Sequence, residues 1–380
     1  MSRLSSSDSL PLSDKLHMIN WGLVAVIVLI GSIGITLLYS AGGKSWTPWA
    51  QAQLIRFLPG LVLMLVIALI DIRFWLRAAY PLYGIIFVLL IVVEIMGQVG
   101  MGAQRWINLG FFVIQPSELM KIALVLALAK YFHALDLEEI AKPTRLFIPL
   151  LMVSAPVGLV LLQPNLGTAT LLLLASAGLF FVAGVRWWKF ALAFMLSGIG
   201  LPYGWKHLHA YQKARLMTFI NPESDPLGAG YNIIQSKIAL GSGGLWGRGF
   251  GMGTQSQLQF LPEKHTDFIF VVLSEEFGMA GALLLLLLYF LLFAYGYMIA
   301  LSSRSQFGRL TAFGLTTTFF LYVFVNVAMV TGLIPVVGIP LPLVSYGGTA
   351  MITLLVGCGL LLGISVHRDA RISRTGIMEI

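Results

Sequence analysis

The chain has 380 residues, of which 58% are hydrophobic and 11% charged, and its mean hydropathy of +0.88 excludes a soluble globular protein. Its single cysteine, Cys358, excludes a disulfide framework and a thiolate metal cluster. The formal net charge of +8 follows largely from the loops between apolar segments, so we expect no nucleic-acid partner.

The hydropathy pattern predicts an all-α polytopic membrane protein, because lipid admits only helices and closed barrels as spanning structures and these apolar runs have helical length. We expect one transmembrane domain over residues 1–380 with about ten spans. They lie near residues 22–42, 54–70, 80–97, 117–135, 146–164, 166–184, 187–205, 267–302, 307–333 and 343–367.

An even number of spans places both termini on one side of the membrane. If residues 1–21 and 368–380 are cytoplasmic tails, cytoplasmic segments hold 14 of the 24 Lys and Arg residues. Six others lie in a connection between the seventh and eighth spans, residues 206–266, which is too long to enter the positive-inside count. The sequence therefore predicts cytoplasmic termini and a large extracytoplasmic loop.

Three short polar segments lie on the same predicted outer side. The first, from Gly102 to Lys121, contains Arg105 and Trp106, which suit the membrane interface. Glu118 and Lys121 follow at a helical i, i+3 spacing and can pair, so a structural ion pair and a substrate role both remain open. The other two segments are the turn QPNLGTA at 163–169 and the proline-rich turn at 332–348.

The fourth polar segment, residues 228–278, is the most unusual. Seven of the thirteen residues between Gly241 and Gly253 are glycine, which lets a ligand approach the main chain. Lys237, Arg248 and Lys264 add cations suited to phosphate. If Thr266 caps the following helix, Asp267 lies in its first turn. A helix cap followed by a solvated loop is the simpler alternative, but four polar segments on one side favour a shared outward-facing cavity.

Several signatures are absent from the sequence. There is no G-x-x-x-x-G-K-[ST] motif, so nucleotide binding is unsupported. His207 and His209 have no third ligand nearby in the sequence, so we predict no metal site there. The sequence has no visible internal repeat and no matching pair of broken helices, which argues weakly against an alternating-access transporter.

Five motifs stand out along the chain: RWINLG with QPSELMK (105–121), QPNLGTA (163–169), GYNIIQSKIALGSGGLWGRGFG (230–251), LPEKHTDFIFVVLSEEFG (261–278) and TGLIPVVGIPLPLVSYGG (331–348). In this order, and covering almost all the spans, they resemble the SEDS family of shape, elongation, division and sporulation proteins. Short tails and the stretch RFWLRAAYPLYG at 73–84 resemble its rod-shape members more than its division members. QPNLGTA departs from the QPDLGTA form of the family, and Asn165 therefore gives no catalytic acid.

The resemblance implies a peptidoglycan glycosyltransferase that polymerises lipid II into glycan strands at the outer face of the bacterial cytoplasmic (inner) membrane during cell elongation. Implied partners are lipid II, the nascent glycan, elongation-complex proteins and a class B penicillin-binding protein (a PBP2-type transpeptidase). The family's essential acid falls on Asp267. Predicted substrate-binding residues are Arg105, Trp106, Glu118, Lys121, Arg215, Gln235, Lys237, Arg248, Lys264 and Ser345.

The chemistry of such a transfer fits these residue types. A sugar hydroxyl that attacks an anomeric carbon bearing a pyrophosphate needs a base, for which we propose Asp267, and cations for the departing phosphates. One carboxylate suffices for an inverting displacement because a diphosphate leaves without a general acid. A divalent cation, Mg²⁺ or Mn²⁺, could bridge Asp267 and the pyrophosphate, although no ligand cluster requires one. A lipid II flippase and a scaffold for the penicillin-binding protein are the alternatives.

Overall fold

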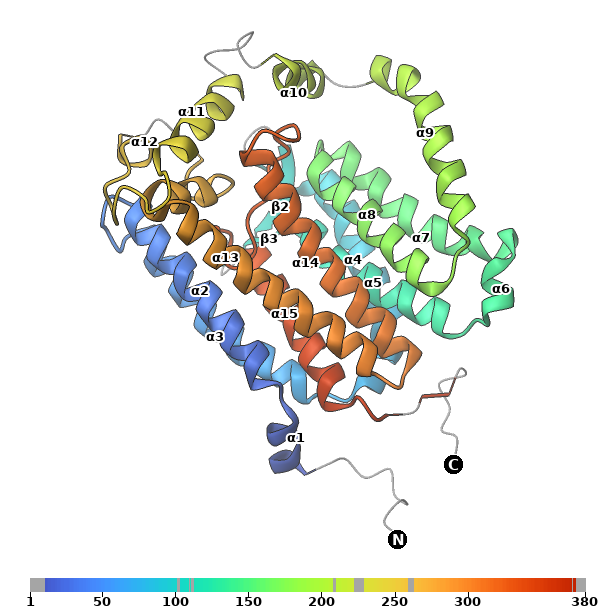
Figure 1. The fold of residues 1–380 in the computed structure, drawn as a ribbon. Coiled ribbons are helices and arrows are strands. Elements are labelled where there is room, and N and C mark those ends of the chain that lie inside the picture. Colours follow the sequence, from blue (N-terminus) through green and yellow to red (C-terminus); the bar gives the residue numbers. More distant parts are fainter. Residues whose placement is uncertain are drawn as a thin grey trace.

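In the computed structural model the chain forms one bundle of long helices, and the described part of the chain begins and ends at the same end of it (Figure 1). We call that the terminal end, and the opposite end, next to residues 206–266, the loop end. The structure describes residues 11–100, 103–108, 110, 113–207, 210–221, 229–258, 263–370 and 372–373.

Long helices make up most of the described chain, and three short strands follow the first four helices. In chain order the elements are α1 (Leu12–Met18), α2 (Trp21–Ala41), α3 (Trp49–Leu69), α4 (Ile72–Met96), β1 (Gln98–Gly100), β2 (Ala103–Asn108), β3 (Val113–Ile114), α5 (Pro116–His133), α6 (Leu137–Ala141), α7 (Pro143–Leu162), α8 (Leu166–Ala183), α9 (Trp187–His207), α10 (Ala210–Ile220), α11 (Ala229–Ser242), α12 (Thr254–Gln257), α13 (Ile269–Ser302), α14 (Gln306–Val330) and α15 (Gly348–Val366).

Each of the ten predicted spans corresponds to one helix, which confirms the polytopic all-α fold. Within the described part of the chain, eight helices are long and apolar enough to cross a membrane, namely α2, α3, α4, α7, α8, α13, α14 and α15. Helix α5 carries Glu118, Lys121 and Lys130, yet most of its residues are buried in the bundle. Helix α9 contributes a shorter apolar stretch, Trp187–Leu196.

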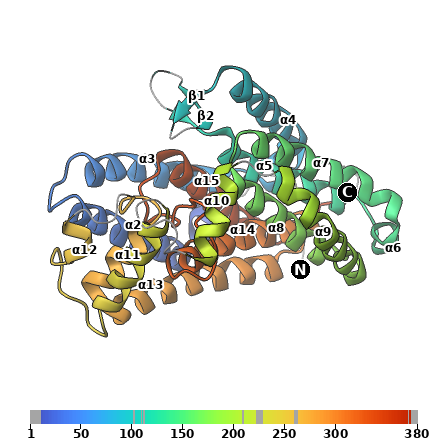
Figure 2. The same cartoon turned by 90° about the horizontal axis from the view of Figure 1, so that it is seen from above.

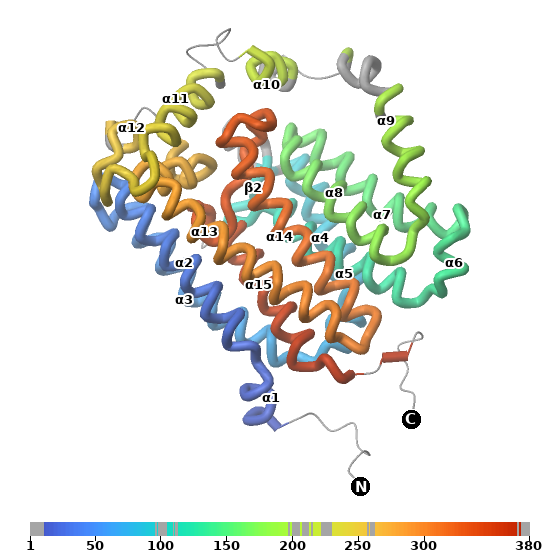
Figure 3. The backbone as a smooth tube through the Cα atoms, viewed as in Figure 1, coloured from blue at the N-terminus to red at the C-terminus, as the bar shows by residue number. Residues whose placement is uncertain are grey.

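Two features at the loop end were not predicted. Residues 206–266 include three helices, α10, α11 and α12, and Figure 3 shows α9, α10 and α11 arching over the bundle. The first polar segment, together with β1 just before it, forms an antiparallel three-stranded sheet in the order β1-β2-β3. Figure 2 shows β1 and β2 at the edge of the bundle beside α4. Short strands with few apolar residues give too weak an alternation to be predicted from sequence.

Small residues allow the central helices to pack closely, as is usual inside membranes. A Cβ added at Gly359 of α15 would lie 2.7 Å from the carbonyl oxygen of Met64 in α3. A Cβ added at Gly34 of α2 would lie 2.6 Å from Val344 Cα, in the turn before α15. Most of the apolar residues buried in these helices belong to one continuous hydrophobic cluster.

Helix α13 is broken at Gly278, where φ is 65° and ψ is −162°. The break removes two helical hydrogen bonds, and the glycine-rich run supplies their replacements. Met279 N and Ala280 N donate to the carbonyl oxygens of Gly244 and Leu245, at 2.9 and 3.1 Å. In return, the carbonyl oxygens of Glu275 and Glu276 each accept a backbone N–H at 3.0 Å, from Arg248 and Gly249.

The glycine run therefore has a packing role that its sequence did not reveal. A Cβ added at Gly243 would lie 2.0 Å from Ser274 O, and one at Gly247 would lie 2.1 Å from Glu276 O. Glycine is required where two backbones approach this closely. We expected a surface shaped for a ligand, whereas these contacts bind the run to α13.

Candidate active site at the loop end

The four polar segments meet at the loop end of the bundle, as their common side predicted. The turn between α14 and α15, residues 331–347, is the centre of this junction. Tyr346 N donates to His265 O at 2.8 Å. Thr349, at the start of α15, donates through its hydroxyl to Val113 O of β3 at 2.8 Å. A Cβ added at Gly167 would lie 2.9 Å from Val337 O.

Asp267 lies in the turn that enters α13, and its position corrects the expectation of a first-turn acid. Helix α13 begins at Ile269, and the Thr266 hydroxyl donates to Glu263 Oε2 at 2.9 Å instead of capping the helix. The half-buried Asp267 carboxylate lies beside Gly338, where an added Cβ would lie 3.3 Å from Oδ2. Gly338 has φ +73°, so glycine suits that turn for two reasons.

Asn326 holds the Asp267 turn against the turn that follows α14. Its side-chain Nδ2 donates to Asp267 O at 2.9 Å and to Ile339 O at 2.7 Å, and Asn326 is fully buried. We did not predict this residue from the sequence. Its place inside an apolar span could have pointed to it, because burying an amide there is costly unless the amide forms hydrogen bonds.

Ser345 also binds the turn that contains Asp267. Its hydroxyl donates to Thr266 O at 2.5 Å and accepts from Leu341 N at 2.7 Å. Ser345 is 4% exposed, and its carbonyl oxygen accepts from Gln53 Nε2 at 3.1 Å. These bonds fix the backbone next to Asp267, while the predicted contact of Ser345 with substrate stays a prediction.

Glu118 and Lys121 form an ion pair, one of the two roles that their spacing left open, with 2.6 Å between Lys121 Nζ and Glu118 Oε1, and their contact with substrate stays a prediction. Tyr322 of α14 completes the cluster, because its hydroxyl donates to Glu118 Oε2 at 2.7 Å and also contacts Lys121 Nζ. All three side chains are buried. Tyr322 precedes Asn326 by one helical turn, about 6 Å, so the cluster lies below Asp267 within the bundle. Tyr322 was not predicted from the sequence.

Arg105 on β2 joins the first polar segment to the turn at 163–169. Its Nε donates to Gln163 O at 3.1 Å, and its Nη2 donates to Pro164 O. Asn165 caps α8, since its side chain accepts from Thr168 N at 3.3 Å. The hydrogen bonding expected of Asn165 is therefore present without a charge. Trp106 lies on the same strand, and its role at the interface or toward substrate stays a prediction.

The predicted loop cations Lys237, Lys264 and Arg248 differ in exposure and in the groups that they contact. Lys237 of α11 is exposed and reaches the central turn, where a Cβ added at Gly332 would lie 3.0 Å from its Nζ. Lys264 is 7% exposed and donates to Ser256 O at 2.6 Å, and burial lowers the pKa of its ammonium group. Arg248 is exposed, and its Nε donates to Ser242 O at 3.3 Å.

Gln235 and Arg215 are the remaining predicted substrate-binding residues. Gln235 is half-buried on α11, two residues before Lys237. Arg215 belongs to α10, but its side chain lies outside the described residues, as do the side chains of His207 and His209.

His265 ties the Asp267 turn to α3. Its ring stacks on Trp49 with 4.6 Å between centroids. Burial, and secondarily the Lys264 ammonium group, lowers the pKa of His265 from 6.5 to about 4. His265 is therefore neutral at neutral pH and serves as a flat packing surface.

Among the described residues, no group of three or more His, Cys, Asp or Glu side chains is placed to hold a metal ion. Asp267 would be the carboxylate available to a divalent cation bound by the substrate's pyrophosphate, and this cation stays a prediction.

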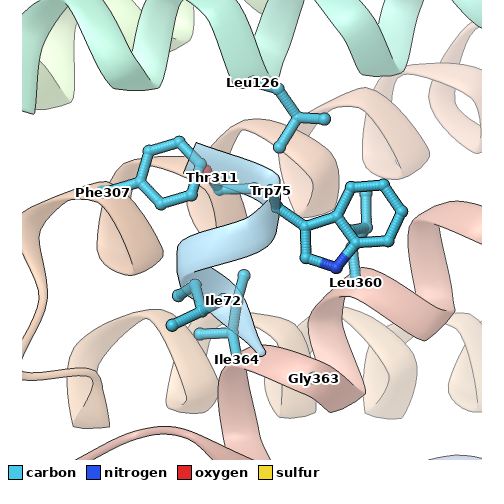
Figure 4. A pocket seen from close by; sticks show the side chains of 8 residues that line it. All are labelled: Ile72, Trp75, Leu126, Phe307, Thr311, Leu360, Gly363 and Ile364. Atoms are coloured by element: carbon cyan, nitrogen blue, oxygen red, sulfur yellow. The ribbon is translucent and has the colours of Figure 1, made fainter. Parts of the chain in front are cut away.

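A small cavity lies away from this junction. It has a volume of about 10 Å³, room for about one water molecule, and Figure 4 shows the residues that line it. Such a cavity cannot hold a saccharide. Its lining residues come from α4, α5, α14 and α15 and are Ile72, Trp75, Leu126, Phe307, Thr311, Leu360, Gly363 and Ile364.

The fold and this junction define a multi-pass membrane protein with a polar, charged site at one end of its helical bundle. A sequence profile described as "Cell cycle protein", which joins FtsW, RodA and SpoVE, matches residues 13–370. The match covers nearly the whole chain. The protein therefore belongs to the SEDS family, as its motifs predicted.

Relatives and solved structures agree with this assignment. The chain is 44% identical over 358 residues to the peptidoglycan glycosyltransferase MrdB of Escherichia coli (strain K12), covering 93% of this chain and 95% of MrdB. It is 37% identical to the stage V sporulation protein E of Bacillus subtilis (strain 168), covering 90% of this chain and 96% of that protein.

Two solved structures share the fold. A chain from a peptidoglycan synthase complex that coordinates polymerization and crosslinking matches with a TM-score of 0.81 and 33% identity, covering 92% of this chain and 98% of that one. The rod shape determining protein RodA of Thermus thermophilus matches with a TM-score of 0.70 and 30% identity, covering 93% and 98%.

Proposed function

We propose that this protein is a peptidoglycan glycosyltransferase that polymerises lipid II into glycan strands during cell elongation. The observation that carries the proposal is the position of Asp267. Its carboxylate is half-buried at the junction of the four polar segments, and Lys237 reaches the same central turn. The names of the relatives and the fold shared with a peptidoglycan synthase complex support the same activity.

In the proposed mechanism Asp267 is the general base. It removes the proton from the 4-hydroxyl of the acceptor sugar as that oxygen forms a bond to the anomeric carbon of the donor. The bond from that carbon to the phosphate oxygen breaks, and the diphosphate leaves with the electron pair. The configuration inverts in this single displacement, and no general acid is needed because a diphosphate is a good leaving group.

Cations near the junction would stabilise the charge that develops on the diphosphate. Lys237 is the best placed of them, because its ammonium group is exposed beside Gly332 of the central turn. Lys264 and Arg105 hold backbone carbonyl groups, and we propose that they shape the site. The polyprenyl tail of lipid II would lie in a groove between helices that opens to lipid.

For location, we propose that the loop end faces outward from the bacterial inner membrane and that both termini are cytoplasmic. The distribution of Lys and Arg residues supports this orientation. For partners, we propose a class B penicillin-binding protein that cross-links the strands. The similarity to a chain of a synthase complex that couples polymerization to crosslinking supports such a pairing.

The test is reconstitution of the purified protein and its penicillin-binding partner in liposomes that contain lipid II. We expect glycan strands, detected by gel electrophoresis, while vesicles without the protein make none. If lipid II crosses the bilayer but no polymer forms under conditions in which a control polymerase works, the protein is a flippase and the proposal is wrong. Normal strands made by a partner alone would instead indicate a scaffold.

A further inference from the structure

The turn that closes the break in α13, residues 243–249, holds two strongly exposed apolar side chains. Leu245 is 60% exposed and Trp246 is 82% exposed. The turn cannot rotate to bury them, because the carbonyl oxygens of Gly244 and Leu245 accept hydrogen bonds from Met279 N and Ala280 N. Their exposure is therefore a fixed feature of the fold.

The length of α13 gives the depth of this turn in the membrane. From Met279 to Ser302 the helix rises about 36 Å, whereas the hydrocarbon core of a bilayer is about 30 Å thick. Arg304 follows at the terminal end and marks the inner boundary. About twenty residues of helix from that boundary reach Leu283, so Met279 and Ala280 lie about 5 Å beyond the hydrocarbon on the loop side.

Helix α2 gives the same level independently. It has 21 residues, about 31 Å, and ends at Ala41. Near that end the Ser40 hydroxyl donates to Glu276 Oε1 at 2.5 Å. The break at Gly278 thus lies where α2 leaves the membrane.

The exposed side chains of the turn continue the lipid-facing surface of α13. Below the break, Met279 is 52% exposed, Leu283 56% and Leu287 53%. The turn is held against the upper end of this apolar stripe, because the carbonyl oxygens of Gly244 and Leu245 accept from Met279 N and Ala280 N. Trp side chains prefer this depth, where the indole ring is partly in hydrocarbon and its N–H reaches water or headgroups.

Further aromatic and cationic side chains lie at the same boundary. The rings of Tyr39 and Phe250 stack at 6.3 Å, and those of Phe250 and Phe277 lie 6.1 Å apart. Exposed Lys44 and Arg248 flank them. Cations at this level attract the phosphates of lipid headgroups.

We infer that the turn at 243–249 is a membrane anchor, in which Leu245 and Trp246 insert at the boundary between headgroups and acyl chains of the outer leaflet. Arg248 then contacts lipid phosphates instead of the donor pyrophosphate. Because the turn is bonded to α13, the anchor fixes the height of the broken helix, and of the preceding loop, relative to the membrane.

Site-directed spin labelling in lipid nanodiscs of phosphatidylethanolamine and phosphatidylglycerol tests this inference. The variants are Trp246→Cys, Leu284→Cys as the lipid control on α13, and Lys213→Cys as the water control on α10, which Figure 1 shows above the bundle. Cys358 is buried, so the labelled wild type serves as the blank. Gel filtration checks that each variant is folded.

We expect a label at position 246 to collide with oxygen as readily as the label at 284, and with a water-soluble nickel chelate at least about fivefold less often than the label at 213. Nickel access equal to that at 213 would place Trp246 in water and overturn the inference. Protection from both reagents would show that protein covers the turn, which overturns it equally.

A second measurement leaves the turn unlabelled. Brominated acyl chains quench nearby tryptophan, so the fluorescence difference between wild type and Trp246→Phe, which reports Trp246, should be smaller in brominated than in unbrominated lipid. An equal difference in the two lipids would contradict insertion of Trp246.

Discussion

Two groups of acids lie close together in the sequence, Asp267 before α13 and Glu275 and Glu276 within its first turns, and their surroundings differ. Glu275 is fully buried, and its carboxylate accepts from Gln255 N at 2.8 Å and Ser256 N at 3.1 Å. Glu276 is 1% exposed and accepts from Ser40. Asp267 is half-buried and adjoins the central turn. The enclosed acids tie α13 to α12 and to α2, whereas we propose that the acid at the open junction takes part in the reaction.

The largest effect on stability is expected when the most enclosed acid is removed. Glu275→Ala leaves the N–H groups of Gln255 and Ser256 without an acceptor and opens a cavity, which costs about 3 kcal/mol. The exposed Glu138→Ala is the matched control, with an expected change within about 0.5 kcal/mol. Unfolding in detergent micelles measures both, and equal midpoints would show that the Glu275 carboxylate does not stabilise the contact between α12 and α13.

Two glycine substitutions test whether the glycine run packs against the broken helix α13 as closely as the structure shows. Gly244 and Gly247 both have positive φ, 55° and 80°, so alanine strains the backbone at either position. Only at Gly247 does the added Cβ clash, 2.1 Å from Glu276 O, while nothing lies within 4 Å at Gly244. Gly247→Ala should therefore destabilise by about 2 kcal/mol more than Gly244→Ala in the same unfolding assay. Equal losses would rule out the close packing.

Asn326→Leu tests whether the Asp267 turn must be held in place. Loss of its two hydrogen bonds leaves Asp267 O and Ile339 O without their donor, and we expect polymerisation to fall about tenfold as the carboxylate shifts. Thr318→Val is the control on the same helix, because the Thr318 hydroxyl donates only within α14, to Gly314 O, among the hydrogen bonds described. An unchanged rate in Asn326→Leu would show that the turn holds its place without this amide.

The smallest expected effect concerns pH. The pKa of His265 is about 4 in the folded protein, below its ordinary 6.5, so the unfolded chain binds more protons between these values. The contribution of His265 to stability is complete above about pH 6.5 and is lost as pH falls toward 4. His265→Gln should reduce the loss of stability over this window, whereas substitution of the exposed His17 by Gln should not. Identical pH profiles of unfolding would contradict the burial of a neutral imidazole.

The sequence predicted the spans well because twenty apolar residues in a row have one outcome in lipid. It also indicated that Glu118 and Lys121 can pair, because an i, i+3 spacing brings them together on one helix face, although a substrate role stayed open. It could not predict that Tyr322 joins them or that Asn326 reaches Asp267, because such contacts depend on which helices become neighbours. The glycine run was misleading for a physical reason: glycine permits close approach, but the sequence does not say whether a ligand or a helix approaches.

The most direct test of the central claim, that Asp267 acts as the base, measures lipid II binding and polymerisation on the same sample of Asp267→Asn in complex with its penicillin-binding partner. Asparagine keeps the shape and hydrogen bonding of the side chain but cannot accept the proton. We predict binding within about threefold of wild type and polymerisation at least about 100-fold slower. Polymerisation at the wild-type rate would contradict the account.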